Sequence, residues 1–330
     1  MEFLTQGRWF LLIALVAMGC RKDPEVMEAV LVETIDLNDV YGTRVAGVAL
    51  GSDYGQQAYF SLAENRVVAQ HDRYAWDVAL THEAEPALLL NHAIPGLRLA
   101  VAGPDWTEWV DETALAWEYD LPTGDAADWA VGRNWAGQTL VLDRGLDATG
   151  APRGYLKFQI TCTDSIQHFR IADLSGAAER QFTAPTDTIH HATEWSLYGG
   201  PLHLAPPRAD WDLLFTNYLH VYEPETDPFP YQVTGALLNP WNHRGARFEG
   251  TDFAEFALTA ELESALTPAW DAIGFDWKSF DFDLGYTVYE ELTFAVDCGA
   301  TGRFALAFTG FYDEQGERGA PQFQFRRLME

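Results

Sequence analysis

The stretches Phe60-Ser61-Leu62 and Trp76-Asp77-Val78-Ala79-Leu80-Thr81 return later in the chain as Trp195-Ser196-Leu197 and Trp211-Asp212-Leu213-Leu214-Phe215-Thr216. Every matched position lies 135 residues after its first occurrence. Apolar runs of this length, rich in aromatic and branched residues, are typical of β-strands and are too short for packed helices. The sequence therefore predicts strands that recur in two related units.

Three further matches extend this repeat toward the end of each unit. They pair LLN at residues 89–91 with 237–239, VGRNW at 131–135 with IGFDW at 273–277, and VLDRG at 141–145 with AVDCG at 295–299. The separation of the matched residues here lies between 142 and 154. Because the matches keep the same order in both halves, we infer an internal duplication with loop insertions.

Hairpins are the expected building block of each unit. Residues 56–68 hold two short β-prone runs around a polar turn, and residues 140–161 and 294–312 are two equivalent hairpins with glycine in their turns. Helix signals are weaker and fall at residues 254–266 and 106–119. We expect an all-β fold with minor helix, built from two related antiparallel β units.

The N-terminus has the features of a lipoprotein signal. Its apolar run, Trp9–Ala17, is too short to cross a bilayer of about 30 Å. Ala17-Met18-Gly19-Cys20 resembles a bacterial lipobox, which predicts removal of residues 1–19 and acylation of Cys20 with chains such as palmitate. The alternative is ordinary secretion with an incidental cysteine. Because Arg21 rather than aspartate follows Cys20, resemblance to sorted lipoproteins favours the outer membrane, at its surface or its periplasmic face.

These signals set the predicted domain boundaries. In order they are a signal peptide at residues 1–19, the lipidated cysteine with a tether or N-terminal strand at 20–50, a first unit at 51–177, a linker at 178–191 and a second unit at 192–330. The sequence leaves open whether the two units fold separately or pack as one body.

The composition of the chain indicates which classes of partner it can bind. The chain has 330 residues, 48% of them hydrophobic, and a formal charge of −28 from 21 Lys and Arg against 49 Asp and Glu. The hydrophobic content is enough for a large core and excludes wholesale disorder. Nucleic-acid binding and adsorption to anionic lipid both need clustered basic residues. We therefore expect no nucleic-acid partner, and a membrane attachment that depends on acyl chains alone.

The chain shows no motif of a known catalytic or metal centre, such as G-x-S-x-G, a P-loop or H-E-x-x-H. Cys162 and Cys298 could pair outside the cytoplasm, but no feature places them close together, and without nearby histidines they do not predict a zinc site. Asp77 and Asp212 are expected to accept amide hydrogens at strand ends, with a carboxylate pair for glycoside hydrolysis as the alternative. We predict neither enzyme activity nor a metal site.

Several stretches of the chain resemble the HmuY family of bacterial surface lipoproteins. They are YFSL, AWDVAL, WDLLFTNY, VTGALLN, IGFDWKSF and FTGFYDEQGERGAPQFQF. The resemblance covers about residues 56–328 as two copies and is densest over 210–328. It implies a β-rich, lipid-anchored protein that binds haem for iron acquisition through axial His or Met side chains and works with an outer-membrane receptor. Residues 93–158 and 244–290, where the resemblance places these ligands, contain neither residue type.

His220 is the remaining candidate for haem. Strand alternation in NYLHVYEPE places Tyr218, His220 and Tyr222 on one face, where they could ligate iron or stack on a porphyrin. The alternative is a half-buried histidine in an aromatic core. The other histidines of interest are expected at the surface or in a solvated linker: His82, His243 and His190-His191.

Two functions follow as hypotheses. The first is a lipid-anchored, non-enzymatic surface protein of the HmuY-like type that binds haem or another hydrophobic planar ligand, with Tyr218, His220 and Tyr222 as contacts. The second is a surface interaction scaffold that keeps this fold without haem and engages a protein or a glycan. The absence of His and Met from the expected ligand segments favours the second.

Overall fold

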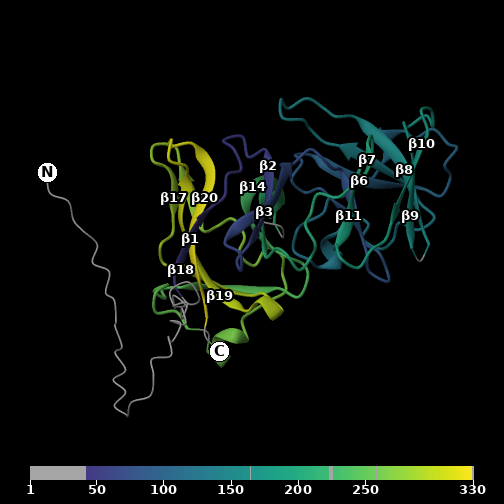
Figure 1. Ribbon diagram of the computed structural model, residues 1–330. Coiled ribbons are helices and arrows are strands. Elements are labelled where there is room, and N and C mark those ends of the chain that lie inside the picture. The colour runs from purple at the N-terminus through teal and green to yellow at the C-terminus, as the bar shows by residue number, and fades with distance from the viewer. Residues whose placement is uncertain (1–41, 164, 223–225, 258, 329–330) are drawn as a thin grey trace, which may run out of the picture. The chain divides into compact units, whose positions relative to one another are not determined.

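Strands make up nearly all the regular structure of the computed structural model, which describes residues 42–163, 165–222, 226–257 and 259–328 (Figure 1). Helical structure within these ranges is limited to four short pieces: η1 (Glu112–Ala114), η2 (Ala126–Asp128), α2 (Ala260–Glu263) and η3 (Gly299–Thr301). The predicted all-β fold with minor helix is confirmed.

Both predicted helices are wrong in extent. The segment 254–266 keeps only the single turn α2, and the segment 106–119 keeps only η1. An isolated helix is marginal in water unless an amphipathic stripe packs against the protein. Neither α2 nor η1 contains a buried residue, so neither has the buried apolar stripe that would stabilise a longer helix.

The strands β4 to β12 follow one another in the chain and form two sheets, which we call the inserted sandwich. They are β4 (Val78–Thr81), β5 (Leu88–Leu90), β6 (Leu97–Gly103), β7 (Thr139–Arg144), β8 (Tyr155–Cys162), β9 (Ile166–Ala172), β10 (Arg180–Pro185), β11 (Ala192–Ser196) and β12 (Gly200–Leu202). The sheet orders are β10-β9-β8-β7-β6 and β12-β11-β4-β5. Both sheets contribute to one hydrophobic core, in which Trp195 stacks on Phe169 with ring centroids 4.0 Å apart.

The remaining strands come from both ends of the described chain and form what we call the terminal sandwich. They are β1 (Arg44–Gly47), β2 (Gln56–Ser61), β3 (Arg66–Asp72), β13 (Leu213–Tyr222), β14 (Phe229–Leu238), β15 (Arg244–Glu249), β16 (Lys278–Asp281), β17 (Gly285–Val288), β18 (Leu292–Asp297), β19 (Arg303–Tyr312) and β20 (Arg318–Arg327). The sheet orders are β1-β20-β19-β18-β15 and β14-β13-β2-β3, with β16-β17 as a separate hairpin. Trp277 stacks on Phe308 in the core at 3.7 Å.

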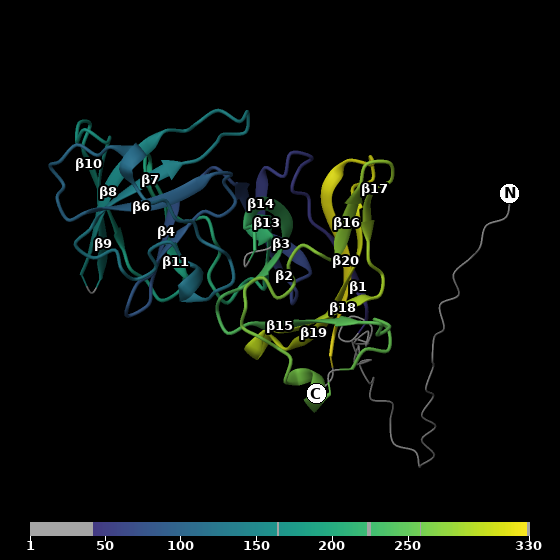
Figure 2. The same cartoon turned by 180° about the vertical axis from the view of Figure 1, so that it is seen from behind.

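The repeated strands pair across the two halves of the sequence rather than within them. In the terminal sandwich β2 pairs with β13, with Phe60 opposite Leu213, and Figure 2 shows β2 and β3 beside β13 and β14. In the inserted sandwich β11 pairs with β4, with Trp195 opposite Val78. Each sandwich therefore takes its Phe-Ser-Leu or Trp-Ser-Leu strand from one copy and its Trp-Asp strand from the other.

The sequence left open whether the two units fold separately. In the structure they do not, because strands of both units pair within the same sheets. The predicted hairpins are confirmed: β2 pairs with β3, β7 with β8, and β18 with β19. The predicted linker, residues 178–191, contains β10, which extends a sheet by pairing with β9. The domain boundaries themselves stay a prediction about the sequence repeat.

The predicted signal peptide, Cys20 and the first part of the tether lie outside the described residues. Within the segment 20–50, β1 forms an edge strand on β20, in line with the expected N-terminal strand. Cys162 and Cys298 are both free. Across the described ranges, no helix has the length and apolar character needed to cross a membrane.

Candidate functional site

Two buried aspartates join the exchanged strands through matching hydrogen bonds. In the inserted sandwich the Asp77 carboxylate accepts a hydrogen bond from Leu197 N at 2.9 Å, and in the terminal sandwich the Asp212 carboxylate accepts one from Leu62 N at 2.7 Å. The backbone N–H of each aspartate donates in turn to the partner strand. The prediction that these aspartates accept amide hydrogens at strand ends is confirmed.

Two histidines expected at the surface are buried, so that expectation is wrong. His243 is 7% exposed, and its Nε2 lies 3.0 Å from Asp212 Oδ1. The ring of His82 is also buried, with Nε2 2.8 Å from Thr193 Oγ1. Each imidazole finds a polar partner below the surface, which the linear sequence does not reveal.

The aromatic face predicted on β13 is formed. Tyr218, His220 and Tyr222 all pack against Phe275, with ring centroids 6.3, 4.8 and 6.1 Å away. His220 also lies 4.8 Å from the ring of Tyr222. The three residues therefore share a face, as alternation along a strand requires.

A glycine contact positions Phe275 on this face. Gly274 has a φ of +72° and exchanges two backbone hydrogen bonds with Ala236 of β14, at 3.0 and 3.1 Å. The neighbouring Gly235 has no room for a side chain, because a Cβ there would lie 2.3 Å from Gly274 O. Only glycine allows this close approach. The IGFDWKSF segment is thereby held against β14, and it carries Phe275 and Lys278.

A cleft of about 590 Å³ opens beside this face. Of the three predicted haem contacts Tyr222 lines it, whereas Tyr218 and His220 contact Phe275 and are not among the lining residues. Its aromatic walls are Tyr54, Tyr222, Tyr231, Phe275, Phe280 and Tyr286. The volume falls within the range of about 300–1,000 Å³ that is usual for small-molecule sites.

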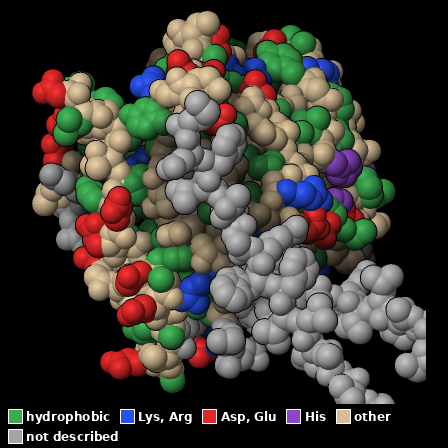
Figure 3. Space-filling view, turned by 60° about the vertical axis from the view of Figure 1, so that its left-hand side comes forward, with side chains coloured by type: hydrophobic (Ala, Val, Ile, Leu, Met, Phe, Trp, Pro, Cys, Tyr) green, Lys and Arg blue, Asp and Glu red, His purple; other side chains and the backbone are tan. Residues whose placement is uncertain are grey.

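The same cleft collects positive charge in a strongly acidic chain. Arg73, Lys278 and Arg318 line it, against one carboxylate, Asp53. On the face shown in Figure 3, carboxylates and basic side chains are both spread among neutral ones. The cleft is therefore suited to an anionic ligand with an aromatic body.

Two polar atoms of the cleft residues are buried without a hydrogen-bond partner among the described residues. They are the donor Arg73 Nε and the acceptor Gln232 Oε1. Buried polar atoms in native proteins are nearly always paired, so these two atoms are exceptions among the cleft residues.

Lys278 is the most perturbed cation of the cleft. Its Nζ donates to Thr234 O at 2.5 Å and to Phe275 O at 3.2 Å, which leaves one N–H for another acceptor. Burial lowers the pKa of this ammonium group to about 7. The charge on Lys278 therefore changes in the neutral pH range.

A second, apolar cavity of about 100 Å³ is lined by residues of both sandwiches. Its walls include Trp76, Trp129, Trp211 and Trp270. Burial lowers the pKa of His92, another lining residue, to about 4, so this imidazole is neutral. The cavity is smaller than ordinary ligand pockets, and we regard the cleft as the candidate binding site.

The histidine pair expected in a solvated linker is divided between two environments. His190 Nδ1 lies 2.9 Å from Asp187 Oδ2. His191 lines the apolar cavity, and burial lowers its pKa. The expectation of a solvated pair is wrong for His191, because the neighbouring segment forms a strand of the sheet rather than a free linker.

Sequence reasoning missed Arg73, Gln232, Phe275 and Lys278 as cleft residues. The segment 244–290 contains no His or Met, but it holds Phe275 and Lys278. The available signal was the match of VGRNW at 131–135 with IGFDW at 273–277, with a lysine directly after it in the second copy only.

Comparison with known proteins yields similar solved structures and no family. No family model matches the chain, and no curated protein matches its sequence. Apo PinO from Porphyromonas gingivalis is similar at a TM-score of 0.27 and 11% identity, over 87% of this chain and 97% of that one. A Bacteroides fragilis protein, predicted to be a lipoprotein, is similar at a TM-score of 0.19 and 11% identity, over 52% of this chain and 94% of that one. Both TM-scores are low, and neither similarity says what this chain binds.

Proposed function

We propose that this chain is a lipid-anchored, non-enzymatic protein of the bacterial envelope that binds a planar, anionic, hydrophobic ligand of the haem class in the cleft beside β13. The observation that carries the proposal is the cleft itself, which combines six aromatic side chains with Arg73, Lys278 and Arg318 in a chain of net charge −28. The anchor rests on the lipobox at Cys20, and the haem class on the resemblance of the strand motifs to the HmuY family.

The residues of the cleft fit such a ligand in size and in chemistry. Aromatic faces such as Tyr222 and Phe275 stack on a flat ring system. The cations offer partners to carboxylates at its edge, and the third N–H of Lys278 is an available donor. If the ligand carries iron, the phenol oxygens of Tyr222 and Tyr231 are the iron-binding groups within the cleft, since tyrosine serves as an axial ligand in some haem proteins.

Titration of the full chain, purified in detergent, with haemin and with metal-free protoporphyrin tests the proposal. We expect saturable binding of both at micromolar concentration, with a shifted Soret band for haemin. Tyr222→Ala weakens both ligands because it removes a stacking face, whereas Tyr222→Phe weakens haemin alone if the phenol meets the iron. Tyr155→Ala, at a similarly exposed tyrosine of the inserted sandwich, is the matched control and leaves binding unchanged.

The contribution of Lys278 is tested through pH. Because its pKa is about 7, the ammonium that attracts a carboxylate is lost as the pH rises through neutrality. Affinity for protoporphyrin is expected to fall between pH 6 and pH 8.5, and Lys278→Met removes this dependence. Absence of porphyrin binding at micromolar concentration, or equal binding by Tyr222→Ala and Tyr155→Ala, contradicts the proposed site. Loss of the Soret shift in His220→Ala alone would assign the iron to the imidazole instead.

A second candidate function is an interaction scaffold for a protein or glycan partner. It is favoured by the β16-β17 hairpin, where Phe282 is 96% and Leu284 is 80% exposed beside the half-exposed Phe280. Exposed apolar side chains gathered in one place mark contact surfaces. The double variant Phe282→Ser and Leu284→Ser is expected to keep porphyrin binding and to lose any partner that wild-type chain retains from outer-membrane extract.

A further inference from the structure

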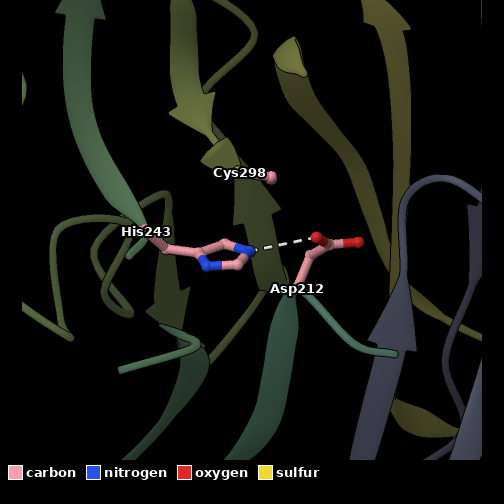
Figure 4. A group of neighbouring side chains, drawn as sticks. All are labelled: Asp212, His243 and Cys298. Atoms are coloured by element: carbon pink, nitrogen blue, oxygen red, sulfur yellow. Dashed lines mark hydrogen bonds and ion pairs between the residues drawn. The ribbon is translucent and has the colours of Figure 1, made fainter. Parts of the chain in front are cut away.

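The terminal sandwich holds three metal-ligating side chains of different chemistry at one point in its core. Asp212, His243 and Cys298 each present one donor atom, and these three atoms lie within 4.8 Å of one another (Figure 4). The residues are 3%, 7% and 5% exposed. They come from separate places in the chain, namely the start of β13, the loop before β15 and the turn after β18.

In the inserted sandwich the equivalent position is occupied by an ion pair between a carboxylate and two arginines. By the sequence repeat Arg144 is the counterpart of Cys298 and Asp77 that of Asp212. Arg144 Nη2 lies 3.1 Å and Arg153 Nη2 3.0 Å from Asp77 Oδ1, so the carboxylate is neutralised by guanidinium groups. In the terminal sandwich the thiol of Cys298 and the imidazole of His243 lie beside the equivalent carboxylate of Asp212 instead.

The hydrogen bonds around the three residues orient them for an ion. His243 Nδ1 donates to Trp241 O at 2.6 Å, which directs Nε2 toward Asp212 Oδ1 at 3.0 Å. A metal-bound histidine characteristically donates its other ring N–H to a carbonyl or carboxylate in this way. Asp212 Oδ2 accepts from Leu62 N at 2.7 Å, which holds the carboxylate with Oδ1 facing the imidazole.

Two protons occupy the cluster when no ion is bound. A hydrogen bond joins His243 Nε2 and Asp212 Oδ1 at 3.0 Å, so one proton lies between these two atoms. Burial, with the nearby Asp212 carboxylate, raises the pKa of the Cys298 thiol well above its usual value, so the thiol keeps its proton. A divalent ion takes the place of the proton between His243 Nε2 and Asp212 Oδ1 and of the proton on Cys298 Sγ, and both protons pass to solvent.

We propose that Asp212, His243 and Cys298 form a binding site for a divalent d-block metal ion, Zn²⁺ in the first instance. Zinc takes thiolate, imidazole and carboxylate ligands at about 2.0–2.3 Å in tetrahedral geometry, which separates donor atoms by roughly 3.3–3.8 Å. The present spread of up to 4.8 Å closes to that value with shifts of about 0.5–0.75 Å for each side chain of a pair. The fourth position falls to a water molecule. The role is structural, because the ion links β13, β15 and β18.

Cobalt substitution tests the site with the full chain carrying Cys20→Ser, so that Cys162 and Cys298 are its only thiols. One equivalent of Co²⁺ is expected to produce a thiolate-to-cobalt charge-transfer band, which one equivalent of Zn²⁺ then removes. Cys298→Ser and His243→Gln lose the band, and Cys162→Ser keeps it as the matched control. Ions held by His82, Asp187 and His190 give no such band, because that group has no sulfur.

Unfolding provides a second measurement that does not depend on colour. Zn²⁺ is expected to raise the urea midpoint of wild type and of Cys162→Ser, and to leave those of Cys298→Ser and His243→Gln unchanged, because an ion that binds only the folded state stabilises it. Circular dichroism confirms that each variant is folded before the titration. Absence of the charge-transfer band in the folded wild-type chain, or its persistence in Cys298→Ser, overturns the proposal.

Discussion

Asp77 and Asp212 occupy the same place in two sandwiches that differ in how they neutralise the carboxylate. Both accept a backbone N–H from the exchanged strand. Asp77 then meets two guanidinium groups, which do not lose their protons in proteins, whereas Asp212 meets an imidazole and a thiol, which do. The comparison shows that the repeat requires a carboxylate at the strand crossing, while the chemistry opposite it is free to diverge.

A second pair of equivalent positions diverges in the same manner. In the inserted sandwich Leu90 N donates to Asp120 Oδ2 at 2.7 Å, and in the terminal sandwich Leu238 N donates to Trp270 O at 2.6 Å. Burial raises the pKa of the Asp120 carboxyl to about 6, although hydrogen bonds from Leu90 N and Ala130 N favour the ionised form. A titratable group thus takes the place of a backbone carbonyl in one sandwich only.

The largest expected effect is that of Asp77→Ala. The substitution leaves Arg144 and Arg153 mostly buried without their counter-charge and Leu197 N without its acceptor. Removing one partner of a buried ion pair typically costs about 3–5 kcal/mol. Urea unfolding measures the loss, with the exposed Asp283→Ala as the control. A loss below about 1 kcal/mol would mean that solvent reaches these guanidinium groups.

Asp212→Ala is expected to cost less, about 1–3 kcal/mol, when metal is absent. The groups beside Asp212 are an imidazole and a thiol rather than guanidinium groups, so the variant leaves an unpaired Leu62 N but no buried guanidinium without a counter-charge. The measurement is the same urea series in the presence of a chelator. An equal or larger loss than for Asp77→Ala would contradict the distinction drawn between the two sites.

Asp120→Asn is expected to change the pH dependence of stability. The folded carboxyl has a pKa of about 6 against roughly 3.9 unfolded, so its favourable contribution is complete below pH 3.9 and is lost as pH rises through 6. An amide at this position does not titrate, so the stability of the variant does not fall with pH for this reason. Asp120→Asn should therefore destabilise the chain by about 1–1.5 kcal/mol less at pH 7.5 than at pH 5. A pH-independent difference, as expected for the control Asp283→Asn, would refute the assignment.

The smallest expected effect is a difference in reactivity between the thiols of Cys162 and Cys298. Cys162 is partly exposed in the inserted sandwich, while Cys298 is buried in the terminal one, with its pKa raised well above the usual value. Maleimide should modify Cys162 roughly tenfold faster or more at pH 7.5 in the chain carrying Cys20→Ser, because the thiolate is the reacting species and must be accessible. Peptide mass mapping measures the ratio of the labelling rates of the two cysteines. Comparable rates would indicate that the core around Cys298 opens frequently.

Local sequence patterns predicted the parts of the fold that depend on near neighbours. The hairpins formed by β2-β3, β7-β8 and β18-β19 follow from short apolar runs around turn residues. Alternation along β13 placed Tyr218, His220 and Tyr222 on one face. The predicted helix at 254–266 failed because helix propensity without a buried stripe does not stabilise more than one turn.

The sequence by itself determined that this chain is all-β and that its strand motifs recur in the same order, because strand length, turn composition and motif order can be read from local sequence. Only the tertiary structure decided that the copies exchange strands, since both Trp-Asp strands present the same edge pattern to either partner. It also decided that Cys298 meets His243 and that Lys278 meets the aromatic face of β13. These pairings join residues far apart in the chain, and they depend on long-range strand pairing and burial, which no local pattern encodes.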